Sequence, residues 1–423
     1  MKKPITNFLQ DYKDTLRLHM PGHAGKSGAD DITEVFGADS LYHTSGIIAE
    51  SESIAARLYG GGAALFSAGG ATLCVQAMVA AAQGKIAADR GCHVSFANAC
   101  ALWGRDVHWI TPSVGSETGL TAPVTAEQVV AALRSDKSIK SVFITGITYY
   151  GLTADVKSIS DVCVEYGAKL FVDNAHGAHL AVSGNHPIQK GADFCCDSAH
   201  KTLNSLTGAA ILHLKDAVFY RRIKSLMSLF GSTSPSYPIL ASIESGVEFL
   251  FENPQLYRNN ILRFRPVLDS SPFDWESFDC MKIIINANSA GYTCQELARH
   301  LRCHKIEPEF TDGKYVLLIC SPLLEDDVCG KLADSLKLTP GKPIAGMKIK
   351  KLSVPVKNMA LYDAVRTENE YTGTENALGR ICAENLSVCP PGSLLVAAGE
   401  LLNEQTITVL KKNNIKRIKA VCV

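Results

Sequence analysis

The sequence has no excess of either charge. Lys and Arg together number 42, and Asp and Glu together also number 42, so the formal net charge at pH 7 is zero. Proteins that bind nucleic acid or an anionic membrane usually carry a clear basic excess, so neither is expected as a partner. The sequence also lacks any run of about 18 apolar residues, the length that a membrane-spanning helix needs.

Metal-binding cysteine pairs and targeting segments are missing as well. None of the 14 cysteines forms a C-x-x-C pair, and several, such as Cys74, Cys195 and Cys320, lie in apolar runs. This pattern favours buried free thiols in a reducing compartment, and no metal site is expected. No apolar segment follows the basic residues Lys2 and Lys3, so we expect no signal peptide and a cytoplasmic location.

What the sequence does contain is enough apolar residues, 46% against 20% charged, for a substantial core. From residue 52 to about 255, short apolar segments alternate with helical patterns, which predicts a mostly parallel, doubly wound α/β sheet. Beyond residue 255 the strand and helix patterns no longer alternate regularly. A basic stretch at 411–419 is expected to be solvated surface. We predict an irregular N-terminal arm over 1–50, a major domain over 51–255 and a smaller α+β domain over 256–423.

Two stretches carry the chemistry. Lys201 lies in a polar loop, 198–203, between two apolar runs, and Asp173 ends an apolar run that begins at residue 169. The two residues are 28 positions apart, which leaves room for one crossover and one further strand. Pyridoxal 5′-phosphate (PLP) needs this pair, because a lysine forms a Schiff base with its aldehyde and a carboxylate keeps its pyridine nitrogen protonated. Either residue alone is an ordinary loop group, but together they predict PLP.

A glycine turn upstream offers a place for the phosphate. Gly69 and Gly70 follow an apolar segment and precede a long apolar helical pattern, and helix N-terminal amides bind anions. Most Gly-Gly turns are only turns, so the turn is weak evidence by itself. Thr72, His93, Asp173 and Lys201 all follow predicted strands, however, and should meet at the carboxyl edge of the sheet.

With these stretches in view, the sequence resembles the fold type I PLP-dependent ornithine/lysine/arginine decarboxylases, in the compact form without an N-terminal wing domain. The resemblance covers nearly the whole chain, and its most specific parts are VDNAHGAH at 172–179 and SAHKTL at 198–203. Other matching stretches are 18–23, 31–34, 56–60, 89–93, 233–237 and 390–392. It implies an aspartate aminotransferase-like major domain.

The resemblance also implies roles for single residues. Lys201 is the Schiff-base lysine, Asp173 contacts the pyridine nitrogen, His93 stacks on the ring, and His176 lies near the phenolic oxygen with Ala175 beside it. After CO₂ has left, either Lys201 or His200 returns the proton, and the sequence does not choose between them. The implied phosphate ligands are Gly70, Ala71, Thr72, Ser198 and His200, with Thr233 and Ser234 acting across a homodimer interface.

Three positions depart from the family pattern. The usual phosphate turn is Asn-Gly-Thr-Ser, whereas this chain has Gly69-Gly70-Ala71-Thr72 and loses a hydroxyl donor. Asn174 stands where Glu is common, and Ala24 stands where Lys is common. Because Asp173 is retained, cofactor binding is expected to survive, while the substrate stays open.

The implied activity is decarboxylation of lysine, arginine or ornithine to a di- or polyamine by a homodimer with shared active sites, or by a larger homo-oligomer. The distal cation of such a substrate needs a carboxylate, and Glu34 and then Asp39 are the candidates. Another PLP reaction on this fold, such as aminotransfer with Arg366 or Arg380 holding the substrate carboxylate, is one alternative. A non-catalytic relative is the other, although Lys201, Asp173 and His93 are all retained.

Overall fold

The computed structural model describes residues 1–423 except 28–29, 117, 326, 345–354, 389–391 and 423. The expected family stretch at 390–392 therefore lies outside the described residues, apart from Gly392. Within the described chain, no helix is both long enough and apolar enough to cross a membrane.

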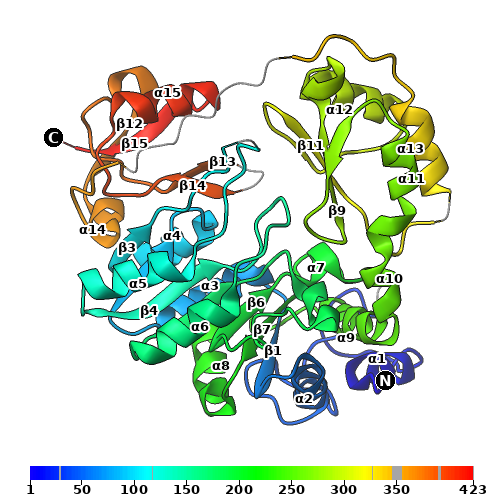
Figure 1. Ribbon diagram of the computed structural model, residues 1–423. Coiled ribbons are helices and arrows are strands. Elements are labelled where there is room, and N and C mark those ends of the chain that lie inside the picture. Colours follow the sequence, from blue (N-terminus) through cyan, green and yellow to red (C-terminus); the bar gives the residue numbers. More distant parts are fainter. Residues whose placement is uncertain (28–29, 117, 326, 345–354, 389–391, 423) are drawn as a thin grey trace.

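A seven-stranded sheet with the order β1-β7-β6-β5-β4-β2-β3 forms the centre of the molecule (Figure 1). The strand pairs from β6 to β3 are parallel, and β7 runs antiparallel to both β6 and β1. The expected mostly parallel α/β fold is confirmed. The strands are β1 (Ala63–Ser67), β2 (Lys85–Asp89), β3 (Val107–Ile110), β4 (Ile139–Thr145), β5 (Lys169–Asp173), β6 (Phe194–Asp197) and β7 (Ala210–Leu214).

Helices cover both faces of this sheet, because its central strands are apolar on both sides. In β4, Phe143 belongs to the core on one face, whereas Val142 and Ile144 belong to the core on the other. Such two-sided burial is typical of parallel sheets. One face is covered by α5 (Ala126–Ser135) and α6 (Val156–Glu165), and the other by α3 (Gly70–Ala81), α4 (Val94–Trp103), α8 (Tyr220–Ser228) and α9 (Tyr237–Glu252).

Beyond residue 256 the chain forms two bodies with separate cores, where one smaller domain was expected. Figure 1 shows them on opposite sides above the large sheet. The first has a core around Ile283, Leu297 and Val316, and the second around Leu410 and Ile418. The first body contains α11 (Arg265–Asp269), β8 (Asp274–Glu276), β9 (Lys282–Asn286), α12 (Cys294–Cys303), β10 (Phe310–Thr311), β11 (Tyr315–Ile319) and α13 (Val328–Leu336). The second contains α14 (Leu361–Arg366), β12 (Asn369–Gly373), β13 (Leu386–Val388), β14 (Ser393–Val396), α15 (Glu404–Lys412) and β15 (Arg417–Val421).

The expectation of solvated surface at 411–419 is wrong for its second half. Strand β15 pairs antiparallel with β12, and Ile418 and Ala420 are fully buried. Lys419 lies between them, and its Nζ lies over the ring of Tyr371. The basic residues thus alternate with buried ones, as they do in a strand with one solvated face.

Buried contacts join both bodies to the large sheet, a histidine–carboxylate contact to the first and an ion pair to the second. His179 Nε2 of the 3₁₀ helix η1 (Ala178–Ser183) lies 2.7 Å from Asp279 Oδ1, and Asp279 Oδ2 lies 2.9 Å from Lys282 Nζ in the first body. Arg90 Nη2, just after β2, lies 2.8 Å from Glu400 Oε2 in the second. Removing one partner of such a buried pair is strongly destabilising, so these contacts fix both bodies in place.

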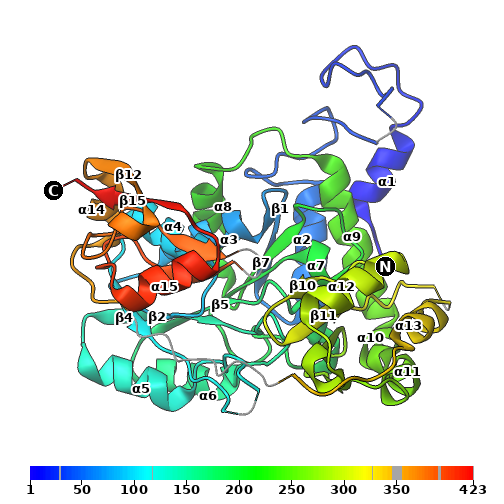
Figure 2. The ribbon, with the colours of Figure 1, turned by 90° about the horizontal axis from the view of Figure 1, so that it is seen from above.

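The N-terminal arm is more regular than expected. Helix α1 (Pro4–Asp11) begins with a proline at its first position, which suits a helix start, and it buries Ile5 and Leu9. Helix α2 (Ile47–Tyr59) begins before the predicted start of the major domain. Between α1 and α2 the described residues form only turns and irregular chain, and Figure 2 shows this segment projecting from the body next to α1.

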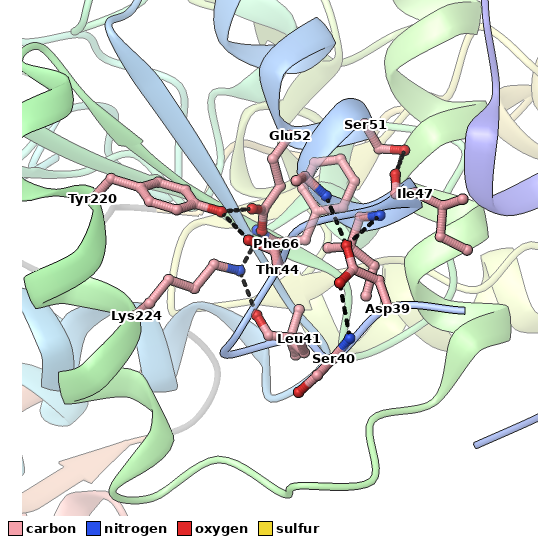
Figure 3. A network of polar contacts seen from close by, with 12 residues as sticks. Asp39, Ser40, Leu41, Thr44, Ile47, Ser51, Glu52, Phe66, Tyr220 and Lys224 are labelled. Atoms are coloured by element: carbon pink, nitrogen blue, oxygen red, sulfur yellow. Dashed lines mark hydrogen bonds and ion pairs between the residues drawn. The ribbon is translucent and has the colours of Figure 1, made fainter. Parts of the chain in front are cut away.

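A buried polar network anchors the end of the arm (Figure 3). Lys224 Nζ on α8 lies 2.5 Å from Glu52 Oε1 and donates to Leu41 O at 2.6 Å. Tyr220 Oη donates to Glu52 Oε2 at 2.5 Å, and the Phe66 N–H donates to Glu52 Oε1 at 2.7 Å. The side chains of Glu52 and Lys224 are only 2% and 3% exposed. The network therefore ties the arm, α2 and α8 together.

Candidate active site

A cavity of about 590 Å³ opens at the carboxyl ends of β2, β4, β5 and β6. This is the edge where ligands bind in open parallel sheets. The cavity brings together ten of the residues singled out in the sequence: Gly70, Ala71, Thr72, His93, Asp173, Ala175, His176, Ser198, His200 and Lys201.

Lys201 lies on the short helix α7 (Ala199–Thr202), which forms within the stretch expected to be a loop. Its Nζ lies 3.1 Å from His176 Nε2. Burial lowers the pKa of Lys201, although the nearby carboxylates of Asp173 and Glu309 oppose the shift. Burial, together with the charge of Lys201, also holds the pKa of His176 well below its usual value. The lowered pKa favours the neutral, nucleophilic amine at Lys201.

Asp173 ends strand β5 and is 7% exposed. Its Oδ1 accepts the Ala175 N–H at 3.1 Å, and the Cys196 thiol donates to the same oxygen at 3.8 Å. Within the described residues, Oδ2 has no hydrogen-bond partner. One carboxylate oxygen is therefore held by the protein while the other is available to a ligand.

His93 precedes α4 and caps it. Its Nδ1 accepts the Ser95 N–H at 3.2 Å and lies 2.8 Å from Ser95 Oγ. A Cβ on Gly392 would lie 2.5 Å from the imidazole, and Gly392 has a φ of +77°, so the second body approaches this ring through a glycine. Burial lowers the pKa of His93, which favours a neutral imidazole lining the cavity.

The first turn of α3 forms the opposite end of the site. Gly70 has a φ of +68°, and a Cβ there would meet nothing within 4 Å, so the turn borders open space. No side chain caps this helix. The Gly70 N–H donates to Gly208 O at 2.8 Å, so the next amides, those of Ala71 and Thr72, are the ones left for an anion. His200 Nδ1 lies 3.1 Å from Ala209 O. A ring that donates from Nδ1 can donate a second hydrogen bond from Nε2 only when it is protonated.

The residues present fit PLP. The cavity contains an amine with a lowered pKa, a carboxylate with a free oxygen, an imidazole and an uncapped helix N-terminus. Two buried polar atoms in its lining, His176 Nδ1 and Thr145 Oγ1, have no partner within the described chain. Such buried atoms are usually satisfied by a ligand or by ordered water.

Sequence analysis missed other residues that line the cavity. Asp89 and Arg90 belong to the matching stretch 89–93, and Tyr149 and Tyr150 follow β4. Because these residues lie at or just after the ends of strands, their place in the sequence could have assigned them to the same sheet edge. The two tyrosines donate hydrogen bonds to acidic residues of the first body, Glu309 and Asp312, so that body closes one side of the site.

Four expected residues lie away from the cavity of their own chain. Thr233 and Ser234 are exposed in the loop between α8 and α9, and Glu34 is exposed on the arm. Neither alternative arginine lines the cavity: Arg366 lies over the ring of Tyr362, and Arg380 pairs with Glu370. The aminotransferase alternative therefore loses the carboxylate ligand that was suggested for it.

Asp39, the fourth, has a structural role instead (Figure 3). It is 4% exposed, and its carboxylate accepts five backbone N–H groups between 2.8 and 3.2 Å, from Ser40, Ser45, Gly46, Ile48 and Ala49. These bonds cap α2 and occupy both oxygens. Asp39 is therefore not retained as a substrate ligand.

We expect Asp39→Ala to lower the free energy of unfolding by about 2 kcal/mol or more, because losing a helix cap alone costs about 0.5–2 kcal/mol. Buried N–H groups left without a partner add to that loss. Urea denaturation at a fixed protein concentration measures the change. Asp14→Ala, at an exposed position on the same arm, is the matched control. Equal stability of the two variants would contradict the capping role.

Comparison with known proteins settles the family. Residues 10–263 match the family model described as "Orn/Lys/Arg decarboxylase, major domain", which is more than half of the chain. The chain belongs to the Orn/Lys/Arg decarboxylase family. The family predicted from the sequence motifs is thereby confirmed.

This Orn/Lys/Arg decarboxylase family member is 27% identical to the arginine decarboxylase of Bacillus subtilis over 445 residues, which covers 95% of the chain and 91% of that protein. The lysine decarboxylase LdcF of Francisella novicida superposes with a TM-score of 0.82 at 16% identity, over 99% of the chain and 81% of LdcF. A structure of SPT with PLP superposes with a TM-score of 0.53 at 14% identity, over 68% and 75%. The two structural likenesses establish a fold type I architecture for this Orn/Lys/Arg decarboxylase family member.

Proposed function

We propose that the chain decarboxylates a basic amino acid, lysine, arginine or ornithine, with PLP bound at Lys201. The observation that carries this proposal is the cavity that unites Lys201, Asp173 and the uncapped start of α3 at one sheet edge. Family membership supports the reaction class, and the arginine decarboxylase aligned over 91% of its length supports a basic substrate.

PLP, when bound, supplies an electron-withdrawing ring that accepts the electron pair released as CO₂ leaves. Asp173 Oδ2 would hold a proton on the pyridine nitrogen, while the Ala175 N–H and the Cys196 thiol keep the carboxylate oriented through Oδ1. The amides of Ala71 and Thr72 would bind the phosphate. His93, fixed by Ser95, lines the ring site.

Lys201 is the group we propose to return a proton to the substrate carbon. Its Nζ contacts His176 Nε2 at 3.1 Å, so the two groups can share a proton. His200 is less suited, because its Nδ1 is engaged with Ala209 O. The exposed Glu34 is proposed to meet the distal cation of a substrate bound in the neighbouring subunit.

Purified protein incubated with PLP should absorb in the visible and lose that band on borohydride reduction. The reduced label should then appear on the peptide that contains Lys201, because its amine has a lowered pKa and lines the cavity. Lys201→Ala should give neither band nor label, whereas Lys190→Ala, outside the cavity lining, should behave as wild type. Release of CO₂ from lysine, arginine and ornithine, tested one by one, identifies the substrate; no release from any of the three would overturn the proposed reaction.

We further propose a cytoplasmic homodimer whose active sites are shared. The described cysteines are all free, as is usual in a reducing compartment. Thr233 and Ser234 are exposed and lie away from their own cavity. A phosphate contact from this loop is therefore possible only across an interface between two copies of the chain.

Mixing the Lys201→Ala protein with a Thr233→Ala/Ser234→Ala protein should restore activity above the sum of the two alone. A mixed dimer has one site with both an intact lysine and an intact loop, so the expected activity per mixed dimer is about half that of wild type. Mass spectrometry of the mixture confirms subunit exchange. Confirmed exchange without any gain would place the loop outside the neighbouring site.

A further inference from the structure

A second buried carboxylate lies one strand away from Asp173. Asp197 ends β6, and its side chain is fully buried. Its Oδ1 accepts a hydrogen bond from Asn174 Nδ2 at 2.7 Å, and its Oδ2 accepts one from His186 Nε2 and one from His213 Nε2, each at 2.9 Å. We call these four residues the Asp197 network; none of them has a role in the mechanism above.

The Asp197 network keeps a net negative charge inside the protein. His186 Nδ1 accepts the Ile188 N–H at 3.4 Å, so Nε2 is the ring nitrogen that donates to Asp197. Burial lowers the pKa of His213 despite the adjacent carboxylate. Burial alone would raise the pKa of Asp197, but the two imidazoles outweigh it and hold the pKa below its usual range. Since both Nε2 atoms are at hydrogen-bond distance from Oδ2, the imidazoles bond Asp197 directly.

Asn174 links this charge to the cofactor site. It directly follows Asp173, its N–H donates to Cys196 O at 2.9 Å, and Asp173 is the register partner of Cys196. A Cβ on Gly177 would overlap Asn174 Oδ1, so only a glycine at position 177 leaves room for the Asn174 side chain. The side chain and the main chain of Asn174 are both tied to β6, and the end of β5 has little freedom to move.

We propose that Asp197 is a positioning residue for the cofactor site. From β6 it supplies a buried negative charge beside the end of β5, and through Asn174 it fixes the strand end that carries Asp173. The inference rests on the proposed PLP site. A negative charge beneath that site favours the protonated pyridine, so the affinity and the titration of bound PLP depend on Asp197.

Two isosteric variants separate charge from packing. In Asp197→Asn, the amide carbonyl still accepts from both imidazoles, and Asn174 can turn its carbonyl toward the new NH₂ group, so only the charge is lost. In Asn174→Asp/Asp197→Asn, the NH₂ group of residue 197 donates to the new carboxylate, and the charge moves to β5. The other titratable groups near Asp197 are unchanged in both variants: His186, His213, Cys74, Cys195, Cys196 and Tyr59.

The measurements are the PLP dissociation constant of the apoprotein, the pH midpoint of the visible band of the bound cofactor, and the melting temperature of the apoprotein. For Asp197→Asn we expect PLP to bind about tenfold more weakly and the midpoint to fall by about one pH unit, with melting close to wild type. The double variant should recover both values to within about twofold.

A wild-type dissociation constant and midpoint in Asp197→Asn would overturn the inference, as would a double variant no better than the single one. If Asp197→Asn fails to fold, the double variant decides: wild-type PLP affinity supports the role, and failure to fold or to bind overturns it. Wild-type protein that binds no PLP would overturn the proposed function itself.

Discussion

Asp173→Asn should lower kcat by more than a hundredfold while the apoprotein melts close to wild type. The substitution preserves the size of the side chain and leaves Oδ1 able to accept the Ala175 N–H, so the end of β5 should keep its shape. It removes the charged partner of the pyridine nitrogen. Breaking a buried charge pair costs about 3–5 kcal/mol, and about 1.4 kcal/mol in the transition state is a tenfold change in rate.

Steady-state decarboxylation, measured with saturating PLP so that weaker cofactor binding does not obscure the rate, tests this expectation. Asp193→Asn is the matched control, because that residue precedes the other end of β6 and pairs with Lys169 on the surface. Its kcat should stay within about twofold of wild type. Activity of Asp173→Asn within a few-fold of wild type would show that the carboxylate only supports the fold.

Lys224→Met should lower the free energy of unfolding by about 3–5 kcal/mol, the usual loss when one partner of a buried ion pair is removed. Glu52 would stay buried without its cation, and Leu41 O would lose its donor (Figure 3). The arm should then detach before the large sheet unfolds. Chemical denaturation at one protein concentration measures the loss, and limited proteolysis locates the first cleavage.

The variant Lys224→Met/Glu52→Gln isolates the charge effect, because it removes the unpaired carboxylate while Gln can still accept the Phe66 N–H. It should recover at least half of the lost stability. A double variant as unstable as Lys224→Met would assign the loss to packing around the lysine stem, and the buried pair would then have little role in holding the arm.

The convergence of the candidate site residues could be predicted because they follow strands that are apolar on both faces. The apolar run expected from residue 169 to Asp173 coincides with β5, and the polar stretch at 198–203 directly follows β6. Once those strands are placed, the parallel arrangement itself brings Asp173, Lys201 and His93 to one edge. Their convergence in one cavity needed no information about distant contacts.

The missed features depend on contacts that local pattern does not encode. The role of Asp39 is set by backbone amides at the start of α2, and a carboxylate in an irregular arm gives no sign of them. Asp197 depends on His213, which comes from the neighbouring antiparallel strand. The division of residues 256–423 follows from which apolar residues share a core, and periodicity places residues on faces without saying which faces meet.

The buried pairs His179–Asp279 and Arg90–Glu400 bear on how this protein can be divided. The family match ends at residue 263, yet both carboxylates lie beyond that point. A fragment cut there would leave His179 and Arg90 without their buried carboxylate partners and uncover the surfaces that the two later bodies protect. The end of the family match is therefore not a point at which the chain can be cut. Chimeras that exchange the later bodies between relatives must carry charge-matched partners at both junctions.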